Sequence, residues 1–426
     1  IMSIQWKPWQ SAYVKPEYQP RRVFGTQGID WQERINFERL RKERLAKLQD
    51  QMKKNDTSAL LLYRGDNIRY ATNTWNGTWR IGAFRYCMVP AEGDPLLFES
   101  VGCDLEADEL YSPWLRGRLE PSISYQFNPG GAYEWGLNRQ IEQIKSFLKK
   151  EGIKISDKIG VDEMLFGPYD AFKKAGFANL VSAQPIIVPA RWIKTKDELE
   201  LLKIAMCIGD AAFGLAREEW VRPGVKECEL EAKIAEFMIA HGMEQGITIC
   251  ASGGNTNPYI RSWGDKMLRP GDMAIMDIIY SYLGYNTDYV RCFPVGHIWS
   301  RKQKELYKRA YDSLMNACES MKPGVNSAKV AEKFEHYADD VFGSDPVVNA
   351  AHSLGMGLYE GLWISRAFAK DYNFHLEEGM YFAVETYAGD PGGFDGARLE
   401  RNGVITDKGF EPFDLFPFEE EGIKGP

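Results

Sequence analysis

Two aspartates at a spacing suited to cation binding lie within residues 273–293, which read MAIMDIIYSYLGYNTDYVRCF. Two strand-like runs flank a short glycine-containing link there, a pattern that predicts a β-hairpin. If Tyr280 pairs with Tyr285, Asp277 and Asp288 lie directly opposite each other, with side chains about 5 Å apart. Burying two like charges is costly, and a metal ion between them removes that cost. In the alternative, one aspartate faces solvent or pairs with a nearby arginine.

Three further side chains that can bind metal follow downstream. His352 begins the glycine-rich run HSLGMG, Glu385 lies in the strand-like run MYFAVETY, and Glu400 lies in FDGARLERNGVIT. A single histidine is more often structural than a ligand, but buried glutamates on strands need partners. Together with Asp277 and Asp288, the set holds four carboxylates and one imidazole. Four negative charges balance two divalent cations, which favours a dinuclear site that activates water or holds a substrate carboxylate.

The composition places these residues in a soluble, core-forming protein of two or three domains. The chain has 426 residues, of which 44% are hydrophobic and 26% are charged, and its net charge is -8. These values disfavour nucleic acid or an anionic membrane as the main partner, so we expect a small-molecule substrate or another protein. Seven cysteines without a C-x-x-C pair, and the lack of a signal-peptide pattern, predict reduced thiols and a cytoplasmic location.

We divide the chain into three parts. Residues 1–30 are polar and aromatic without periodicity, which fits either an extension that wraps the body or a disordered tail. Residues 31–185 alternate helical and strand-like patterns and predict an α/β domain, and residues 186–426 form a second domain. The expected helices of the first domain are 31–55, 138–151 and 169–176, and its expected strands include 58–63, 84–90, 95–100 and the run KIGVDE.

The second domain opens with a helix whose start is encoded locally. Thr195, followed three residues later by Glu198, forms a capping box, and the apolar period after it predicts a helix to about Glu219. Residues 221–237 and 321–337 share a Pro-Gly-Val turn and a following helix, one hundred residues apart. Two related halves of this kind predict a pseudo-two-fold domain, although Pro-Gly is also common before helices in general.

Several of these segments resemble the pita-bread metallopeptidase family, which includes Xaa-Pro dipeptidase, aminopeptidase P, methionine aminopeptidase and the metal-free creatinase. The segments are ARWIKTKDELELLKIA, the hairpin ending GYNTDYVRCF, HSLGMG, EEGMYFAVE and RLERNGVIT, and they span most of residues 185–426. The first domain is similar, more weakly, to the creatinase-type N-terminal domain.

The resemblance implies an α/β (α+β) fold in which a creatinase-like domain precedes a pita-bread catalytic domain. It also implies two divalent metal ions, with Fe, Mn, Zn and Co as candidates, bound by Asp277, Asp288, His352, Glu385 and Glu400. Asp288 and Glu400 would bridge the two ions. A homodimer is expected from the family alone.

Two positions depart from the peptidases of this family. Tyr259 ends the segment ASGGNTNPY where the peptidases have a histidine, and Tyr359 precedes Glu360 where they have a second histidine. Tyrosine, with a pKa near 10, does not shuttle protons at neutral pH as imidazole does. These departures disfavour peptide hydrolysis and leave the metal site intact.

The dimethylsulfoniopropionate lyases, a branch that cleaves a C–S bond, fit better. Similar to that branch are SGGNTNPY, the interval of fifteen residues from Glu385 to Glu400, NIRYATNTWNGTW and GFEPFDLFPF. The chain differs at Ile279, where the branch has a third hairpin aspartate, and Leu358-Tyr359-Glu360 offers no clear counterpart of the branch's base.

The first hypothesis is therefore a metal-dependent lyase that acts on a small zwitterionic carboxylate by β-elimination. Glu360, or less favourably a deprotonated Tyr359, would remove the proton next to the substrate carboxylate while an onium group leaves. Trp75, Trp79 and Tyr259 would enclose that onium group by cation–π contacts worth about 1 kcal/mol each, and the alternative role for the tryptophans is packing.

The second hypothesis is a metal-dependent hydrolase of a small C–N substrate, in which Glu385 passes a proton to the leaving amine. A third is a binding protein that has lost catalysis. Retention of all five ligand residues argues against the third, because buried carboxylates without metal destabilise a domain.

Overall fold

The computed structural model describes residues 34–74, 85–100, 103–125, 130–244, 246–335, 349–367, 369 and 371–426. The chain divides into two compact units, Ile1–Ala190 and Arg191–Pro426. The division therefore follows residue 190 rather than residue 185, and both positions lie within helix α7 (Gln184–Trp192). The expected extension at residues 1–30 and the two tryptophans Trp75 and Trp79 lie outside the described residues.

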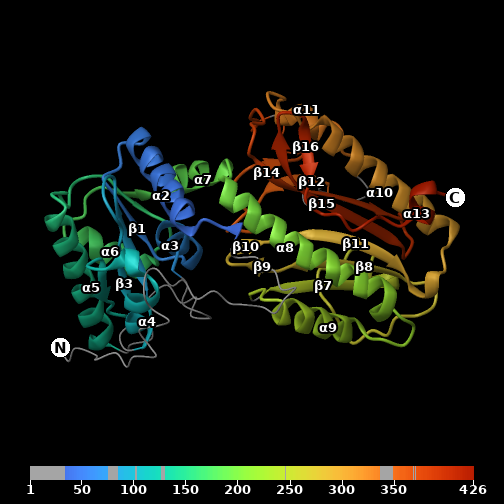
Figure 1. Ribbon diagram of the computed structural model, residues 1–426, viewed down its shortest axis with the longest axis horizontal. Helices are drawn as coiled ribbons and strands as arrows, with labels where there is room; N and C mark the ends of the chain where they lie inside the picture. The colour runs from blue at the N-terminus through green and yellow to red at the C-terminus, as the bar shows by residue number, and fades with distance from the viewer. Residues whose placement is uncertain are drawn as a thin grey trace. The chain divides into compact units, whose positions relative to one another are not determined.

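The first unit is built on a six-stranded sheet with the order β4-β3-β2-β1-β5-β6 (Figure 1). Its strands are β1 (Ala59–Leu62), β2 (Tyr86–Pro90), β3 (Leu96–Glu99), β4 (Leu119–Pro121), β5 (Ile159–Val161) and β6 (Leu180–Ser182). Before α7 its helices are α2 (Phe37–Lys54), α3 (Gly65–Thr72), α4 (Cys103–Tyr111), α5 (Gly131–Lys150) and α6 (Phe166–Lys174). Strand β1 pairs antiparallel with β2 and parallel with β5, so the expected α/β architecture is confirmed.

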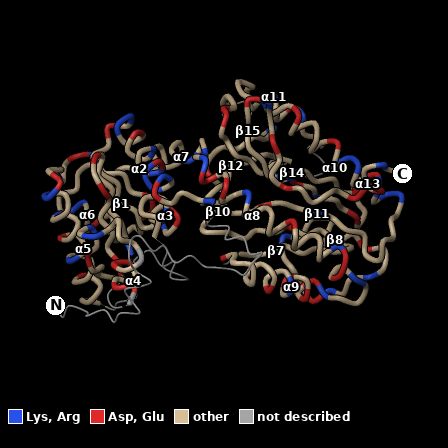
Figure 2. The backbone as a smooth tube through the Cα atoms, viewed as in Figure 1, with Lys and Arg blue, Asp and Glu red and all other residues tan. Residues whose placement is uncertain are grey.

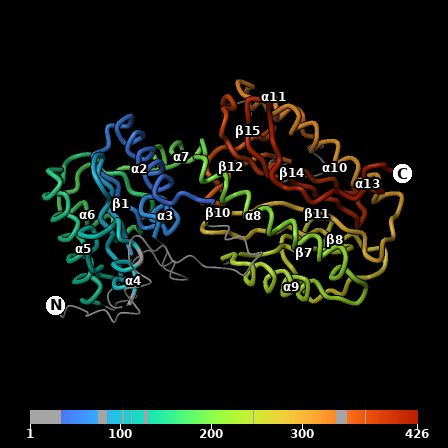
Figure 3. The backbone as a smooth tube through the Cα atoms, viewed as in Figure 1, coloured from blue at the N-terminus to red at the C-terminus, as the bar shows by residue number. Residues whose placement is uncertain are grey.

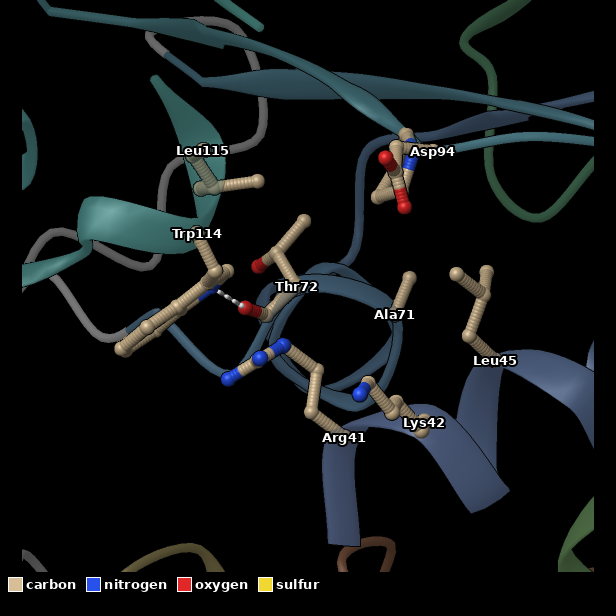
Figure 4. Close-up of a pocket in the computed structure, with 9 residues that line it drawn as sticks. Arg41, Lys42, Leu45, Ala71, Thr72, Asp94, Trp114 and Leu115 are labelled. Atoms are coloured by element: carbon tan, nitrogen blue, oxygen red, sulfur yellow. Dashed lines mark hydrogen bonds between the residues drawn. The ribbon is translucent and has the colours of Figure 1, made fainter. Parts of the chain in front are cut away.

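A cavity of about 220 Å³ opens in the first unit (Figure 4). The guanidinium of Arg41 lies over the indole of Trp114, 4.5 Å from the ring centroid, and the indole Nε1 donates to the carbonyl of Thr72 at 2.8 Å. Leu45 and Ala71 give the cavity apolar walls. None of the candidate metal ligands lines this cavity.

The second unit contains a three-stranded sheet with the order β11-β8-β7, a five-stranded sheet with the order β13-β12-β14-β15-β16, and the pair β10-β9. Its strands are β7 (Ile247–Ser252), β8 (Met273–Ile279), β9 (Ser281–Tyr282), β10 (Tyr285–Asn286), β11 (Tyr289–Pro294), β12 (Ala350–Ser353), β13 (Trp363–Ile364), β14 (Tyr381–Gly389), β15 (Gly396–Thr406) and β16 (Gly409–Pro412). Its helices are α8 (Lys196–Leu215), α9 (Glu227–Ala240), α10 (Arg301–Ser320), α11 (Ser327–Ala331) and α13 (Glu420–Lys424). Helix α9 packs against β7 and α10 packs against β14 and β15, while β11 lies beside β15 (Figure 3).

Helix α8 starts where the sequence predicts. The N–H of Glu198 donates to the Thr195 hydroxyl at 3.3 Å, and the N–H of Thr195 donates to the Glu198 carboxylate at 2.8 Å. The helix then continues as a π-helical turn, Ala216–Trp220, so the predicted end near Glu219 is confirmed.

The Pro-Gly-Val repeat has the same geometry in both halves of the second unit. Gly224 and Gly324 have φ values of 91° and 81°. Their N–H groups donate to the carbonyls of Leu268 and Leu376 at 2.9 and 2.7 Å, and helices α9 and α11 begin three residues after each glycine. The predicted pseudo-two-fold organisation is confirmed.

Basic and acidic side chains are interspersed along both units (Figure 2). Within the described part of the chain, no helix combines the length and the apolar character that crossing a membrane requires. Among the described cysteines, Cys87, Cys228, Cys250, Cys292 and Cys318 are free thiols.

The repeat gives a first prediction. Gly324→Ala should destabilise the second unit by roughly 1–2 kcal/mol, because an added Cβ meets no atom within 4 Å but the left-handed backbone disfavours any L side chain. Gly214→Ala, in the interior of α8 with its nearest neighbour at 3.9 Å, should instead stabilise it by about 1 kcal/mol. Denaturant unfolding measures both, and equal shifts for the two variants would contradict this interpretation.

Candidate metal site

The hairpin that carries the two aspartates has a register shifted by two residues from the expected one, because Tyr285 pairs with Tyr282 and not with Tyr280. Leu283 and Gly284 have φ values of 46° and 89°, and two-residue hairpin turns require such positive values. Tyr282 therefore pairs with Tyr285 across a two-residue turn.

The predicted direct opposition of Asp277 and Asp288 is wrong. In the observed register Asp277 pairs with Val290, and Asp288 immediately precedes strand β11. The observed register differs from the expected one by two residues. Because side chains along a strand alternate between the two faces of the sheet, Asp288 stays on the same face as Asp277 and lies diagonally across from it.

Three of the five candidate ligands form a tight buried cluster. Potential ligand atoms of Asp288, His352 and Glu400 all lie within 4.8 Å of one another. The His352 Nε2 lies 3.2 Å from the Asp288 Oδ2. His352 belongs to β12 and Glu400 to β15, so three segments of the chain meet at this point.

The other two candidates lie beside this cluster. Glu385 on β14 pairs directly with Glu400 on β15, and its carboxylate forms an ion pair with Arg398. Asp277 is 3% exposed, and its Oδ1 has no hydrogen-bond partner among the described residues. Burial and the nearby charge of Asp288 raise the pKa of Asp277 to about 7.

Among the described residues, Glu400 is the one of the four carboxylates with no hydrogen-bond partner on either oxygen. It is fully buried, and neither of its carboxylate oxygens has a hydrogen-bond partner in the described part of the chain. Burial, followed by the charges of Asp288 and Glu385, raises its pKa well above the usual range. An orphaned carboxylate among three others fits a site for divalent cations, because oxygen-rich clusters with one imidazole suit such ions.

His352 is held between aromatic rings. Its imidazole centroid lies 4.7 Å from the ring of Tyr359 and 5.4 Å from that of Trp363, which is stacked on it at 14°. Burial lowers the pKa of His352, but the hydrogen bond and charge of Asp288, with the charge of Glu385, outweigh this effect and raise it.

The two tyrosines expected near the site differ in exposure. The Tyr259 hydroxyl is buried without a hydrogen-bond partner among the described residues, and the Arg398 guanidinium lies 5.2 Å from its ring centroid. Burial and the charge of Asp277 raise the pKa of Tyr259 well above 10. Tyr359 is 61% exposed, and partial desolvation with the charge of Asp288 raises its pKa to about 12. Both phenols therefore stay protonated near neutrality.

Glu360 lies outside the cluster in a separate ion pair. The Lys194 Nζ donates to one carboxylate oxygen at 2.7 Å, and the N–H of Gly357 donates to the other at 2.9 Å. Arg191 lies 3.7 Å from this second oxygen. Both oxygens are engaged with donors, so this placement argues against Glu360 as a general base.

Two parts of the site were not found in the sequence. Arg398 lies two residues before Glu400 on the same strand, so strand alternation could have placed both on one face. Trp363 lies on β13, a two-residue strand too short to give a periodic pattern, and its contact with His352 depends on the sheet register.

Comparison with known proteins gives matches along most of the chain. Residues 200–407 match the family described as Metallopeptidase family M24, and residues 44–193 match the Creatinase/Prolidase N-terminal domain. The dimethylsulfoniopropionate lyase DddP of Roseovarius nubinhibens is 24% identical over 397 residues, which cover 90% of this chain and 87% of the lyase. The Xaa-Pro dipeptidase of Pyrococcus horikoshii is 28% identical over 377 residues, covering 86% and 95%.

Solved structures show the same fold. The recombinant prolidase from Thermococcus sibiricus superimposes with a TM-score of 0.72 at 24% identity, over 89% of this chain and 98% of that one. The Xaa-Pro dipeptidase from Bacillus anthracis gives a TM-score of 0.71 at 23% identity, over 89% and 98%.

The raised pKa of Asp277 predicts how metal-free protein responds to pH. An unfolded aspartate titrates near pH 3.9, so between about pH 4 and 7 the folded chain holds a proton that the unfolded chain has released. The contribution of Asp277 to the free energy of unfolding should fall as pH rises through this range, by up to about 1.4 kcal/mol per pH unit. Thermal unfolding after chelator treatment measures the total slope, and Asp277→Asn should make it less steep, while Glu400 and His352, whose pKa values are also raised, keep part of it. A wild-type stability that rises with pH would contradict the assignment.

Proposed function

Because this chain belongs to the M24 metallopeptidase-like family, we propose that it is a metal-dependent enzyme acting on a small zwitterionic carboxylate. Two divalent ions would be held by five buried side chains, namely Asp277, Asp288, His352, Glu385 and Glu400. The orphaned carboxylate of Glu400 beside three like charges is the observation that carries the metal site. Bound ions would act there as Lewis acids toward substrate oxygens.

The reaction that we propose is β-elimination of dimethylsulfoniopropionate or a closely similar onium carboxylate. A base takes the proton from the carbon next to the carboxylate. The electron pair of that C–H bond forms the C=C bond, and the C–S electrons leave with dimethyl sulfide. This reaction needs one proton acceptor and no proton donor, because a sulfonium leaves as a neutral sulfide.

The side chains around the cluster fit a reaction that needs no proton donor. Tyr259 and Tyr359 stand where the peptidase resemblance leads us to expect imidazoles, and both phenols hold their protons near neutrality. A peptide nitrogen must be protonated as it leaves, whereas a sulfonium sulfur need not be. Glu360 is engaged by Lys194 and Glu385 is paired with Arg398, so we assign the role of proton acceptor to neither carboxylate.

Aromatic faces beside His352 support an onium substrate. Tyr359 is exposed, and its ring centroid lies 5.9 Å from that of Trp363. A sulfonium against such faces gains about 1 kcal/mol per contact. The contribution predicted for Trp75 and Trp79 stays a prediction, as do the homodimer and the cytoplasmic location.

A hydrolase of small C–N substrates is the second candidate. It is supported by the Xaa-Pro dipeptidase relative, whose identity to this chain is comparable to that of the lyase. In this candidate Glu385 would pass a proton to the leaving amine.

Substrate incubation separates the two reactions. We expect protein loaded with Mn²⁺, Fe²⁺, Zn²⁺ or Co²⁺ to release dimethyl sulfide from dimethylsulfoniopropionate and no proline from an Xaa-Pro dipeptide. Gas chromatography and a free-proline assay provide the measurements. Proline release without dimethyl sulfide would replace the lyase by the hydrolase.

Asp288→Ala tests the metal site itself. This variant should lose metal uptake and reduce activity by at least about 100-fold, because it removes a carboxylate from the center of the cluster. Metal content by mass spectrometry and turnover rate are the measurements. Asp312→Ala, which removes an exposed carboxylate from α10, is the matched control and should retain both. A fully loaded Asp288→Ala protein would exclude this residue from the site.

A further inference from the structure

The segment after β16 contains a buried carboxylate that contacts both strands flanking the candidate site. Asp414 is fully buried, and its Oδ1 accepts from the N–H of Asn402 on β15 at 3.0 Å. Its Oδ2 accepts from the Arg291 Nη2 on β11 at 2.8 Å and from the Arg401 Nε at 3.1 Å. One carboxylate therefore joins two strands that are adjacent in space but more than one hundred residues apart.

The partners of Asp414 bind the backbone of two candidate metal ligands. The Arg291 Nη1 donates to the carbonyl of Glu400 at 2.7 Å. The Asn402 side chain donates to the carbonyl of Asp288 at 2.5 Å and accepts from the Asp288 N–H at 3.3 Å. We call Asp414, Arg291 and Asn402 the C-terminal clasp.

We propose that Asp414 is a positioning residue that fixes the separation of Asp288 and Glu400 through the clasp. This inference rests on the proposed function, because it takes these two residues as metal ligands. Their side chains repel each other, since the charge of Asp288 contributes to the raised pKa of Glu400. The clasp holds both backbones against that repulsion, and residues behind metal ligands commonly change metal affinity 10–100-fold.

The position of Arg291 within the clasp depends on the carboxylate of Asp414. Its guanidinium is 1% exposed, donates also to the carbonyl of Phe416, and lies 4.2 Å from the ring centroid of Phe418. Without a carboxylate at position 414, this buried cation loses its ion-pair partner on that side. It would then shift, and with it the Glu400 carbonyl that it binds.

The test is the affinity for Mn²⁺, measured by isothermal titration on full-length wild-type and variant protein. Asp414→Asn keeps an oxygen for the Asn402 N–H but turns an amide donor toward Arg291, and we expect its Kd for Mn²⁺ to rise 10–100-fold. Arg291→Lys keeps the charge but loses the fork that spans Asp414 and Glu400, and we expect a similar rise. This second variant keeps the test decisive if the first fails to fold.

Asp210→Asn is the matched control. Asp210 is a carboxylate that accepts from the N–H groups of Leu415 and Phe416 at 2.8 and 3.1 Å, so it holds the same segment. It also accepts from the Tyr289 hydroxyl at 3.0 Å, and no hydrogen bond to Asn402 or Arg291 is found within the described residues. We expect this variant to lower the melting temperature of the metal-free protein and to keep the Kd within about twofold of wild type.

The outcomes separate this inference from the proposed function. An unchanged Kd in Asp414→Asn and Arg291→Lys, or an equal rise in Asp210→Asn, would overturn the positioning role and leave the function standing. If Mn²⁺ binds tightly and the binding weakens only in the clasp variants, the positioning role is supported. If wild-type protein then releases no dimethyl sulfide, the proposed lyase function is overturned. Wild-type protein that binds no Mn²⁺ would overturn both.

Discussion

The burial of four carboxylates around one imidazole is the constraint on which the second unit depends. Each of the five side chains is at most 5% exposed, and water therefore cannot offset their mutual repulsion. Arg398 pairs with Glu385, but Glu400 and one oxygen of Asp277 have no hydrogen-bond partner among the described residues. Divalent cations would relieve this repulsion, so the arrangement that destabilises the metal-free chain is the one that we propose for metal binding.

The pseudo-two-fold fold divides these charges between its sheets. Strands β8 and β11 of the three-stranded sheet hold or flank Asp277 and Asp288, while β12, β14 and β15 of the five-stranded sheet carry the remaining three residues. Neither sheet alone assembles the set, and packing them together brings like charges into contact. The clasp is located at this junction, where β11 lies beside β15. If the proposed site binds metal, its affinity and the stability of the second unit are coupled.

The sequence predicted the features that depend on local patterns. The capping box at Thr195 and the two Pro-Gly-Val turns were found because each needs only a few neighbouring residues. The hairpin register was missed because its turn requires Leu283 at positive φ, a conformation that a leucine side chain disfavours and no pattern announces. The ion pair that engages Glu360 was missed for another reason, since its partner Lys194 is 166 residues away in the chain.

The same constraint explains how one scaffold can support two reactions. Removing any one of the five proposed ligands would leave an uncompensated buried charge or an incomplete site, so we expect this set of residues to resist change. Tyr359, beside the cluster, can be replaced more easily, because it is largely exposed and its loss leaves no buried charge. An imidazole at such a position can deliver a proton to a leaving amine, whereas a phenol ring supplies a π face and a hydrogen-bond donor. In the proposed function, exchange of one for the other would shift the preferred leaving group from an amine that needs a proton to an onium that needs none, while the metal site would stay the same.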